Sequence, residues 1–172
     1  MIKRSLVASL SLSAAALVGM AVSEWYVGEA MIPTKGDRPT LGFGSTFHED
    51  GRPVRLGERT DPVRALVTLQ AHVSKEEAAF QRSLPGASLT QGEYDLYMDF
   101  VYQYGTGAWS GSSMRRRVLA QDYRGACDAL LLWRKQAGRD CSLPQHWGPQ
   151  GCKGVWTRQR ERHAKCLAEQ EG

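Results

Sequence analysis

The sequence predicts an α+β fold that is mainly helical, with a small antiparallel sheet near the N-terminus followed by a helical lobe. Two observations support this prediction. Residues 28–57 are dense in glycine and proline, which excludes long helices there. From residue 60 onward, helix-start signals and apolar residues at helical spacing alternate with short breaks. The 172 residues, 42% of them apolar, are enough for one compact core with a short appendage.

The sheet is expected in the glycine-rich part of the chain. Residues 40–46 place threonine, leucine and phenylalanine between glycines, which is typical of a short strand. The Asp50-Gly51 pair just after it is a sequence that closes hairpins. We therefore expect short antiparallel strands joined by tight turns.

Four later segments are expected to be helices. The first opens at Asp61-Pro62, where proline suits the first helical turn. The second opens at Thr90-Gln91-Gly92-Glu93, a capping-box sequence, and Gly105 is its expected C-terminal cap. The third opens at Asp122, and the fourth covers residues 155–167.

The first 23 residues have the composition of an export segment. Lys3 and Arg4 precede residues 5–23, which carry no charge and, as one helix, would reach roughly across a hydrocarbon core. Such basic residues hold the N-terminus inside the cell and send the downstream chain across the membrane. We therefore expect a signal anchor over residues 1–23, with the domain of residues 24–172 outside the cytoplasm. Serine, alanine and glycine dilute the apolar stretch, so its burial in lipid is only weakly favourable. A cleavable signal peptide remains an alternative, because Ala21-Val22-Ser23 supplies the small residues that a signal peptidase accepts, and a buried core helix is another.

The four cysteines favour disulfide bonds. All lie in the last third of the chain, and an even number in a small exported protein is typical of an oxidising compartment. No Cys-x-x-Cys or close Cys/His spacing indicates a metal site, so neither a metal nor a cofactor is expected. The sequence does not fix the pairing; we expect Cys141 with Cys152 and Cys127 with Cys166.

The charge of the chain suits a negatively charged partner. The formal net charge of +4 and the pI near 9 fit a bacterial envelope, a membrane surface or a nucleic acid. Charge alone does not choose between these partners.

Three polar residues near the anchor could support hydrolysis of a glycosidic bond. This reaction needs a carboxylic acid that protonates the leaving oxygen and a second polar group that positions or activates water. Glu24 comes directly after the apolar segment, and Asp37 lies three residues before Thr40, so a hairpin could bring all three together. The alternative for Asp37 is a turn hydrogen bond, the usual role of aspartate in a Gly/Pro turn.

The motifs around these residues closely resemble those of phage-type lysozymes, glycoside hydrolase family 24. The resemblance opens with Glu24, Pro33, Gly36-Asp37 and residues 39–46. The resemblance continues through residues 89–95, 105–108, 122–127, 138–142 and 151–158. Only the N-terminal segment and residues 143–150 fall outside it.

This resemblance implies a lysozyme-like fold and the activity of a muramidase. The expected reaction is hydrolysis of the β-1,4 linkage between N-acetylmuramic acid and N-acetylglucosamine in peptidoglycan, typically with inversion, leading to host cell lysis as in an endolysin. Glu24 is implied as the general acid, Asp37 as a group that stabilises charge or helps activate water, and Thr40 as the holder of the attacking water. The family usually places its carboxylate six residues before the threonine, where this chain has Thr34, so Asp37 is the nearest acidic substitute. Gln103 stands where relatives often carry a glycan-facing asparagine, which indicates a substrate contact or a structural hydrogen bond.

The resemblance extends to signal-arrest-release endolysins, which are inactive while anchored and active once released to the periplasm. It implies a monomer whose partners are peptidoglycan and the inner membrane, and no nucleic acid. Two rival functions differ in chemistry. One is a membrane-tethered module that binds peptidoglycan without cutting it, and the other is a lytic transglycosylase, which forms an anhydro sugar.

Overall fold

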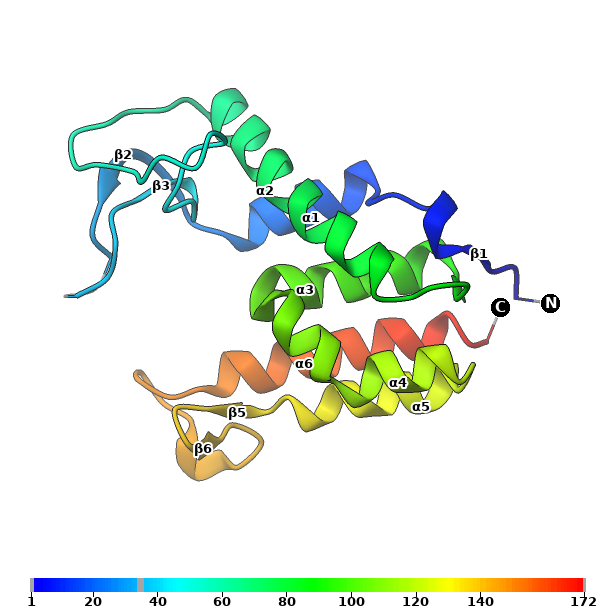
Figure 1. The fold of residues 1–172 in the computed structure, drawn as a ribbon. Coiled ribbons are helices and arrows are strands. Elements are labelled where there is room, and N and C mark those ends of the chain that lie inside the picture. The colour runs from blue at the N-terminus through cyan, green and yellow to red at the C-terminus, as the bar shows by residue number, and fades with distance from the viewer. Residues whose placement is uncertain (1, 34–35, 172) are drawn as a thin grey trace. The chain divides into compact units, whose positions relative to one another are not determined.

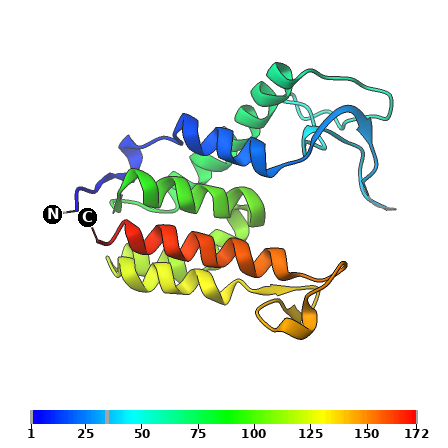
Figure 2. The same cartoon turned by 180° about the vertical axis from the view of Figure 1, so that it is seen from behind.

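The computed structural model describes residues 2–33 and 36–171, so Thr34 lies outside the described residues. The chain forms two compact units (Figures 1 and 2). Unit 1 combines Met1–Ser11 with Phe80–Gly172, and unit 2 is Leu12–Ala79. These units are defined by contacts in space. The division into an anchor at residues 1–23 and a catalytic domain at residues 24–172, expected from the sequence, stays a prediction.

Unit 2 contains the small sheet. It comprises α1 (Ala14–Ser23), β2 (Tyr26–Met31), β3 (Thr40–Phe43) and most of α2 (Pro62–Arg82). Strands β2 and β3 pair antiparallel, and the turn over residues 48–51 closes with a hydrogen bond from the Gly51 N–H to the His48 carbonyl, 3.0 Å. The predicted antiparallel sheet and the helix start at Pro62 are confirmed.

Glycine lets β3 approach the first turn of α2 closely. Gly42 has φ +63°, and a Cβ there would lie 2.8 Å from the Cβ of Ala65. A larger residue would therefore push the strand from the helix. The apolar cluster that the sheet itself buries is small and consists of Ala30, Leu41 and Val54.

Unit 1 is mainly helical. The predicted capping box is present in it: Thr90 Oγ1 accepts the Glu93 N–H at 3.0 Å, and Glu93 Oε2 accepts the Thr90 N–H at 2.8 Å. Its named elements are β1 (Ser5–Leu6), β4 (Ser88–Leu89), α3 (Gln91–Gly111), α4 (Ser113–Leu119), α5 (Tyr123–Ala129), β5 (Lys135–Gln136), β6 (Arg139–Asp140) and α6 (Lys153–Ala168).

The expected cap at Gly105 is a break within α3. Gly105 has φ 82° and ψ 158°, which interrupts the helix, but the chain resumes helical geometry as far as Gly111. Helices α5 and α6 cover the segments predicted to open at Asp122 and to span residues 155–167. The spacing of apolar residues did not predict α4 or the β5–β6 hairpin.

Aromatic rings fill the core of unit 1. The Trp109 ring lies 5.0 Å from that of Phe80 and 5.1 Å from that of Tyr97, measured between ring centroids, and all three side chains are buried. Burial raises the pKa of the Tyr97 hydroxyl far above its usual value, so this group stays neutral.

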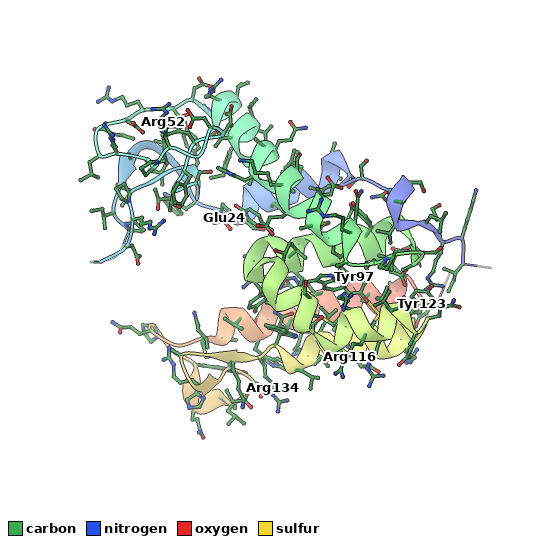
Figure 3. The ribbon with its side chains drawn as sticks, in the orientation of Figure 1. Glu24, Arg52, Tyr97, Arg116, Tyr123 and Arg134 are labelled. Atoms are coloured by element: carbon green, nitrogen blue, oxygen red, sulfur yellow. A yellow bond between two sulfur atoms is a disulfide. The ribbon has the colours of Figure 1, made fainter. Side chains whose placement is uncertain are left out.

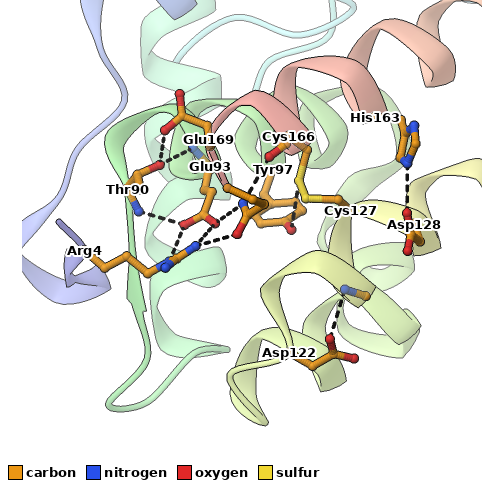
Figure 4. The surroundings of a disulfide bond; sticks show 12 residues. Arg4, Thr90, Glu93, Tyr97, Asp122, Cys127, Asp128, His163, Cys166 and Glu169 are labelled. Carbon is orange, nitrogen blue, oxygen red and sulfur yellow. Dashed lines mark hydrogen bonds and ion pairs between the residues drawn. A yellow bond between two sulfur atoms is a disulfide. The ribbon is translucent and has the colours of Figure 1, made fainter. Parts of the chain in front are cut away.

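Two disulfides complete unit 1, and they are the pairs expected from the sequence. Cys127–Cys166 joins α5 to α6 (Figure 4), and Cys141–Cys152 closes the loop between β6 and α6. The first spans 39 residues of sequence and the second 11.

The start of the chain is part of the fold of unit 1. The Arg4 guanidinium donates to both carboxylate oxygens of Glu93, at 2.7 and 3.0 Å, and to Gln170 Oε1 at 2.7 Å. It also stacks over the Tyr123 ring, 3.6 Å from the centroid. The Glu93 side chain is only 1% exposed, so Arg4 supplies the countercharge of a buried carboxylate (Figure 4).

The uninterrupted helix considered for residues 5–23 is not formed. The segment contains β1, a 3-10 helix at Val7–Ser9 and the ten-residue α1. Helix α1 begins after Ser13 because the Ser13 hydroxyl accepts the Ala16 N–H, an N-cap that starts a helix. Within residues 2–33 and 36–171, none of the helices combines the length and the apolar composition that spanning a bilayer requires.

Candidate active site

Glu24 stands at the junction of α1 and β2 in unit 2 (Figure 3). Its N–H donates to the Met20 and Ala21 carbonyls, at 3.2 and 3.3 Å, and so closes the helix. Its own backbone is extended, with φ −97° and ψ 144°, and turns the chain into the strand. The carboxylate is therefore placed by backbone geometry and is half-buried.

Gly44 makes room for this carboxylate. Its φ of +77° is a left-handed conformation that favours glycine, and a Cβ there would lie 3.3 Å from Glu24 Oε2. Among the described residues, the Glu24 side chain makes no hydrogen bond or ion pair. Its oxygens are thus available to an incoming group.

Thr40 and Asp37 lie toward the other end of the same hairpin. The register pairs Tyr26 with Phe43 near Glu24, and Met31 with Thr40. Phe43 lies three positions after Thr40, roughly 10 Å along an extended chain. The Thr40 hydroxyl donates to the Arg38 carbonyl at 3.3 Å.

The three predicted residues therefore share one unit, with Glu24 just before β2, Asp37 in the loop before β3 and Thr40 at the start of β3. Asp37 is exposed in the loop that precedes β3. Within the described part of the chain, neither Asp37 nor Thr40 bonds to the Glu24 carboxylate. A bound substrate would have to connect the two ends of the hairpin.

Aromatic side chains hold the Glu24 end of the hairpin. The rings of Tyr26 and Phe43 lie 5.4 Å apart, and the Tyr26 hydroxyl donates to the Thr60 carbonyl at 3.0 Å. Trp25, next to the acid, is 87% exposed and presents its indole to solvent.

Charges near β3 are largely compensated. A hollow of about 240 Å³ beside β3 and α2 is lined by Arg52, Arg59 and Arg64. Each has an acidic partner: Asp50 at 2.7 Å, Glu29 at 2.9 Å and Glu49 at 3.7 Å, respectively. The hydrogen bond from Arg52 holds the pKa of Asp50 below its usual value, so the pair stays ionised near neutral pH.

Gln103 belongs to unit 1, two residues before the break in α3. Its Oε1 is buried and has no hydrogen-bond partner among the described residues. Burying an acceptor without a donor costs free energy, so a hydrogen bond to this atom would be stabilising.

Metal-binding geometry is not found in the described ranges, where no three His, Cys, Asp or Glu side chains form a group that could hold an ion. Sequence reasoning missed Gly44. The sequence did contain a signal for it, because Gly44 directly follows Phe43 in the segment expected to form a strand.

Comparisons with known proteins agree with this architecture. The family model described as phage lysozyme matches residues 27–145. The endolysin of Salmonella phage P22 is 33% identical over 102 residues, covering 59% of this chain and 68% of that protein. The SAR-endolysin of Escherichia phage 933W is 35% identical over 131 residues, covering 73% and 68% respectively.

A solved structure shares the fold. The endolysin from Escherichia coli O157:H7 phage FAHEc1 superimposes with a TM-score of 0.75 at 25% identity, covering 92% of this chain and 94% of that one. The family match spans more than half of the chain. The chain belongs to the phage lysozyme family.

Proposed function

We propose that this chain cuts the β-1,4 linkage between N-acetylmuramic acid and N-acetylglucosamine with Glu24 as its acid catalyst, and acts as an endolysin. Membership of the phage lysozyme family makes the chain a lysozyme whose substrate is peptidoglycan. The observation that carries the assignment of Glu24 is its half-buried carboxylate at the end of α1, which lies against Gly44 and has no hydrogen-bond or ion-pair partner among residues 2–33 and 36–171.

The roles proposed for the triad rest on its chemistry. Glu24 protonates the leaving glycosidic oxygen, while Thr40 holds the attacking water and Asp37 stabilises charge or helps activate that water. Their position around one antiparallel strand pair supports this division of roles, because one substrate could touch both ends of that pair. Inversion at the anomeric carbon is the expected outcome.

Gln103 is proposed as a contact to the glycan. Its buried Oε1, for which the described part of the chain offers no donor, supports this role, because an N-acetyl N–H or a sugar hydroxyl that reached it would satisfy it.

The N-terminal segment is proposed to anchor the newly made protein in the inner membrane and then to leave it. Two of the relatives, from Escherichia phages N15 and 933W, are named SAR-endolysins, which supports this proposal. So does the mixed character of the segment: Val7 and Met20 are buried here, whereas Leu6 and Val22 are exposed. The released form is proposed to be a periplasmic monomer that keeps all of its first residues.

The catalytic assignment is tested by Glu24→Gln, which keeps size and hydrogen bonding but removes the acid. Loss of general acid catalysis should slow the clearing of cell-wall suspensions by about 10²–10⁴-fold, with an unchanged circular dichroism spectrum. The matched control is Glu29→Gln, an exposed carboxylate on the same hairpin that pairs with Arg59. The assignment fails if Glu24→Gln clears walls as fast as the control.

Two further measurements test the finer points. Mass spectrometry of the digested glycan should show reducing-end sugars with a water added; anhydro ends would indicate a transglycosylase. The intact mass of protein recovered from the periplasm should include residues 1–23, and a chain that starts at Glu24 would contradict release without cleavage.

A further inference from the structure

A second hollow lies on the outer side of α6, in unit 1. Its volume is about 300 Å³, at the small end of the range of roughly 300–1,000 Å³ for ligand sites. The family resemblance leaves residues 143–150 without a role, and one wall of this hollow comes from that loop. Its lining is Trp147, Lys153, Trp156, Thr157, Arg160, Glu161 and Ala164.

The spacing of the helical residues explains why this face is free. Residues 153, 156, 157, 160, 161 and 164 recur at intervals of three and four, so they share one side of α6. The other side carries the buried Gln159, Arg162 and Cys166. The lining face of α6 is thus a solvent-facing surface that carries one indole ring, Trp156, and the loop adds a second, Trp147.

The loop holds Trp147 in a fixed orientation. The Cys141–Cys152 disulfide joins the ends of the loop, and the Cys152 N–H donates to the His146 carbonyl at 2.9 Å. The Trp147 indole N–H donates to the Cys141 carbonyl at 2.9 Å, so its polar atom is used internally. The side chain is 37% exposed, and the Lys153 ammonium lies 4.9 Å from the ring centroid.

We propose that this hollow is an accessory binding site for the glycan strand of peptidoglycan. Indole faces suit the apolar C–H faces of sugar rings, while the Thr157 hydroxyl and the Glu161 carboxylate can bond to sugar hydroxyls and acetamido N–H groups. Lys153 and Arg160 give the site a local positive charge that suits the carboxylates of the muramic acid peptides. The proposal rests on peptidoglycan being the substrate.

Shape and charge favour a glycan over a lipid surface. Tryptophan and lysine also occur at membrane interfaces, but a membrane needs a surface that it can cover, whereas this site is hollowed. Glu161 in the lining is a hydrogen-bond acceptor, to which the many hydroxyls of a sugar can donate and the phosphates of lipid headgroups cannot.

The test measures binding by the full chain in a Glu24→Gln background, so that the wall is not cut during the assay. Trp147→Ala and Trp156→Ala should each raise the Kd for purified sacculi at least fivefold in cosedimentation. Because Trp156 lies on α6, its variant keeps the disulfide loop intact. Leu132→Ala, which truncates a 66% exposed side chain of unit 1 outside the hollow, is the control and should bind as the parent does.

Arg160→Ala separates the charge contribution from stacking. It should weaken binding to sacculi but not to neutral N-acetylglucosamine oligomers, whereas the tryptophan variants weaken both. Arg124→Ala, an exposed arginine of the same unit outside the hollow, should change neither. Equal binding of all variants to sacculi would overturn the proposal. Loss of binding to anionic lipid vesicles, with sacculus binding unchanged, would instead assign the hollow to a membrane.

The two proposals fail separately. If Glu24→Gln still cleared walls, the catalytic assignment would fall while the binding comparison stood. If the hollow variants bound sacculi normally, the accessory site would fall while the catalytic assignment stood.

Discussion

Units 1 and 2 position an acidic side chain in opposite ways. Glu93 in unit 1 is buried, caps α3 and is bonded to Arg4, so it is saturated with partners. Glu24 in unit 2 is half-buried and lies against Gly44, and the described residues leave its carboxylate unpaired. The first arrangement suits stability and the second suits chemistry, because a saturated carboxylate has no oxygen left for a substrate.

The surroundings differ in the same way. Unit 1 has an aromatic core around Trp109 and both disulfides, whereas the sheet of unit 2 buries a small aliphatic cluster and relies on glycines such as Gly42 and Gly44. We therefore expect stability and turnover to respond to different substitutions.

The largest expected effect on stability comes from the Cys127–Cys166 disulfide. Replacing both residues by serine should lower the free energy of unfolding by about 4 kcal/mol, because a long loop is freed in the unfolded chain. The Cys141–Cys152 pair closes a shorter loop and should lower it by about 3 kcal/mol. Urea denaturation measures both, and the reverse order would contradict the loop-length argument.

Removing Arg4 should be nearly as costly. Arg4→Met leaves Glu93 buried without its cation, which should lower stability by about 3 kcal/mol. Thermal unfolding is the measurement, with Lys3→Met as control because Lys3 is exposed. Adding Glu93→Gln to Arg4→Met should restore part of the loss, and a purely additive double variant would show that the pair is not coupled.

Gly44 allows the chemistry of unit 2 to be separated from its stability. Gly44→Ala and Gly51→Ala both place a side chain at a positive φ, at a cost of about 1–2 kcal/mol each. A Cβ at Gly44 meets Glu24, whereas one at Gly51 has nothing within 4 Å. Wall-clearing rates should therefore fall, by up to about 100-fold, only for Gly44→Ala. Equal rates would show that the contact does not position the acid.

The smallest effect is a pH dependence in unit 1. The Gly125 N–H and Arg117 lower the pKa of Asp122, so its stabilising contribution is full above the unfolded value of about 3.9 and is lost as pH falls through the folded value. Asp122→Ala should lower the Tm slightly near neutral pH and not at all in strong acid. Asp122→Asn keeps the cap oxygen and should lose only the pH dependence. A constant Tm difference across pH would contradict the assignment.

Local signals in the sequence predicted much of unit 1. The Thr90–Glu93 capping box is complete within four residues, so the start of α3 was predictable. Gly105 was predicted to end the helix, and its backbone does interrupt it, but the prediction of a C-terminal cap was wrong because the chain resumes a helix up to Gly111.

Long-range geometry could not be predicted. The Arg4–Glu93 pair joins residues 89 apart in sequence, and no spacing rule relates them. In unit 2, the sequence indicated that Glu24, Asp37 and Thr40 share a hairpin, but only the register shows Thr40 beside Met31.

The location of the cysteines gives the two units different sensitivity to reductants. All four belong to unit 1, and the loop that presents Trp147 is closed by one of their bonds. Dithiothreitol would therefore loosen that loop while leaving the covalent structure around Glu24 unchanged. Lysis assays run with and without a thiol would report how much of the rate depends on holding the wall and how much on cutting it.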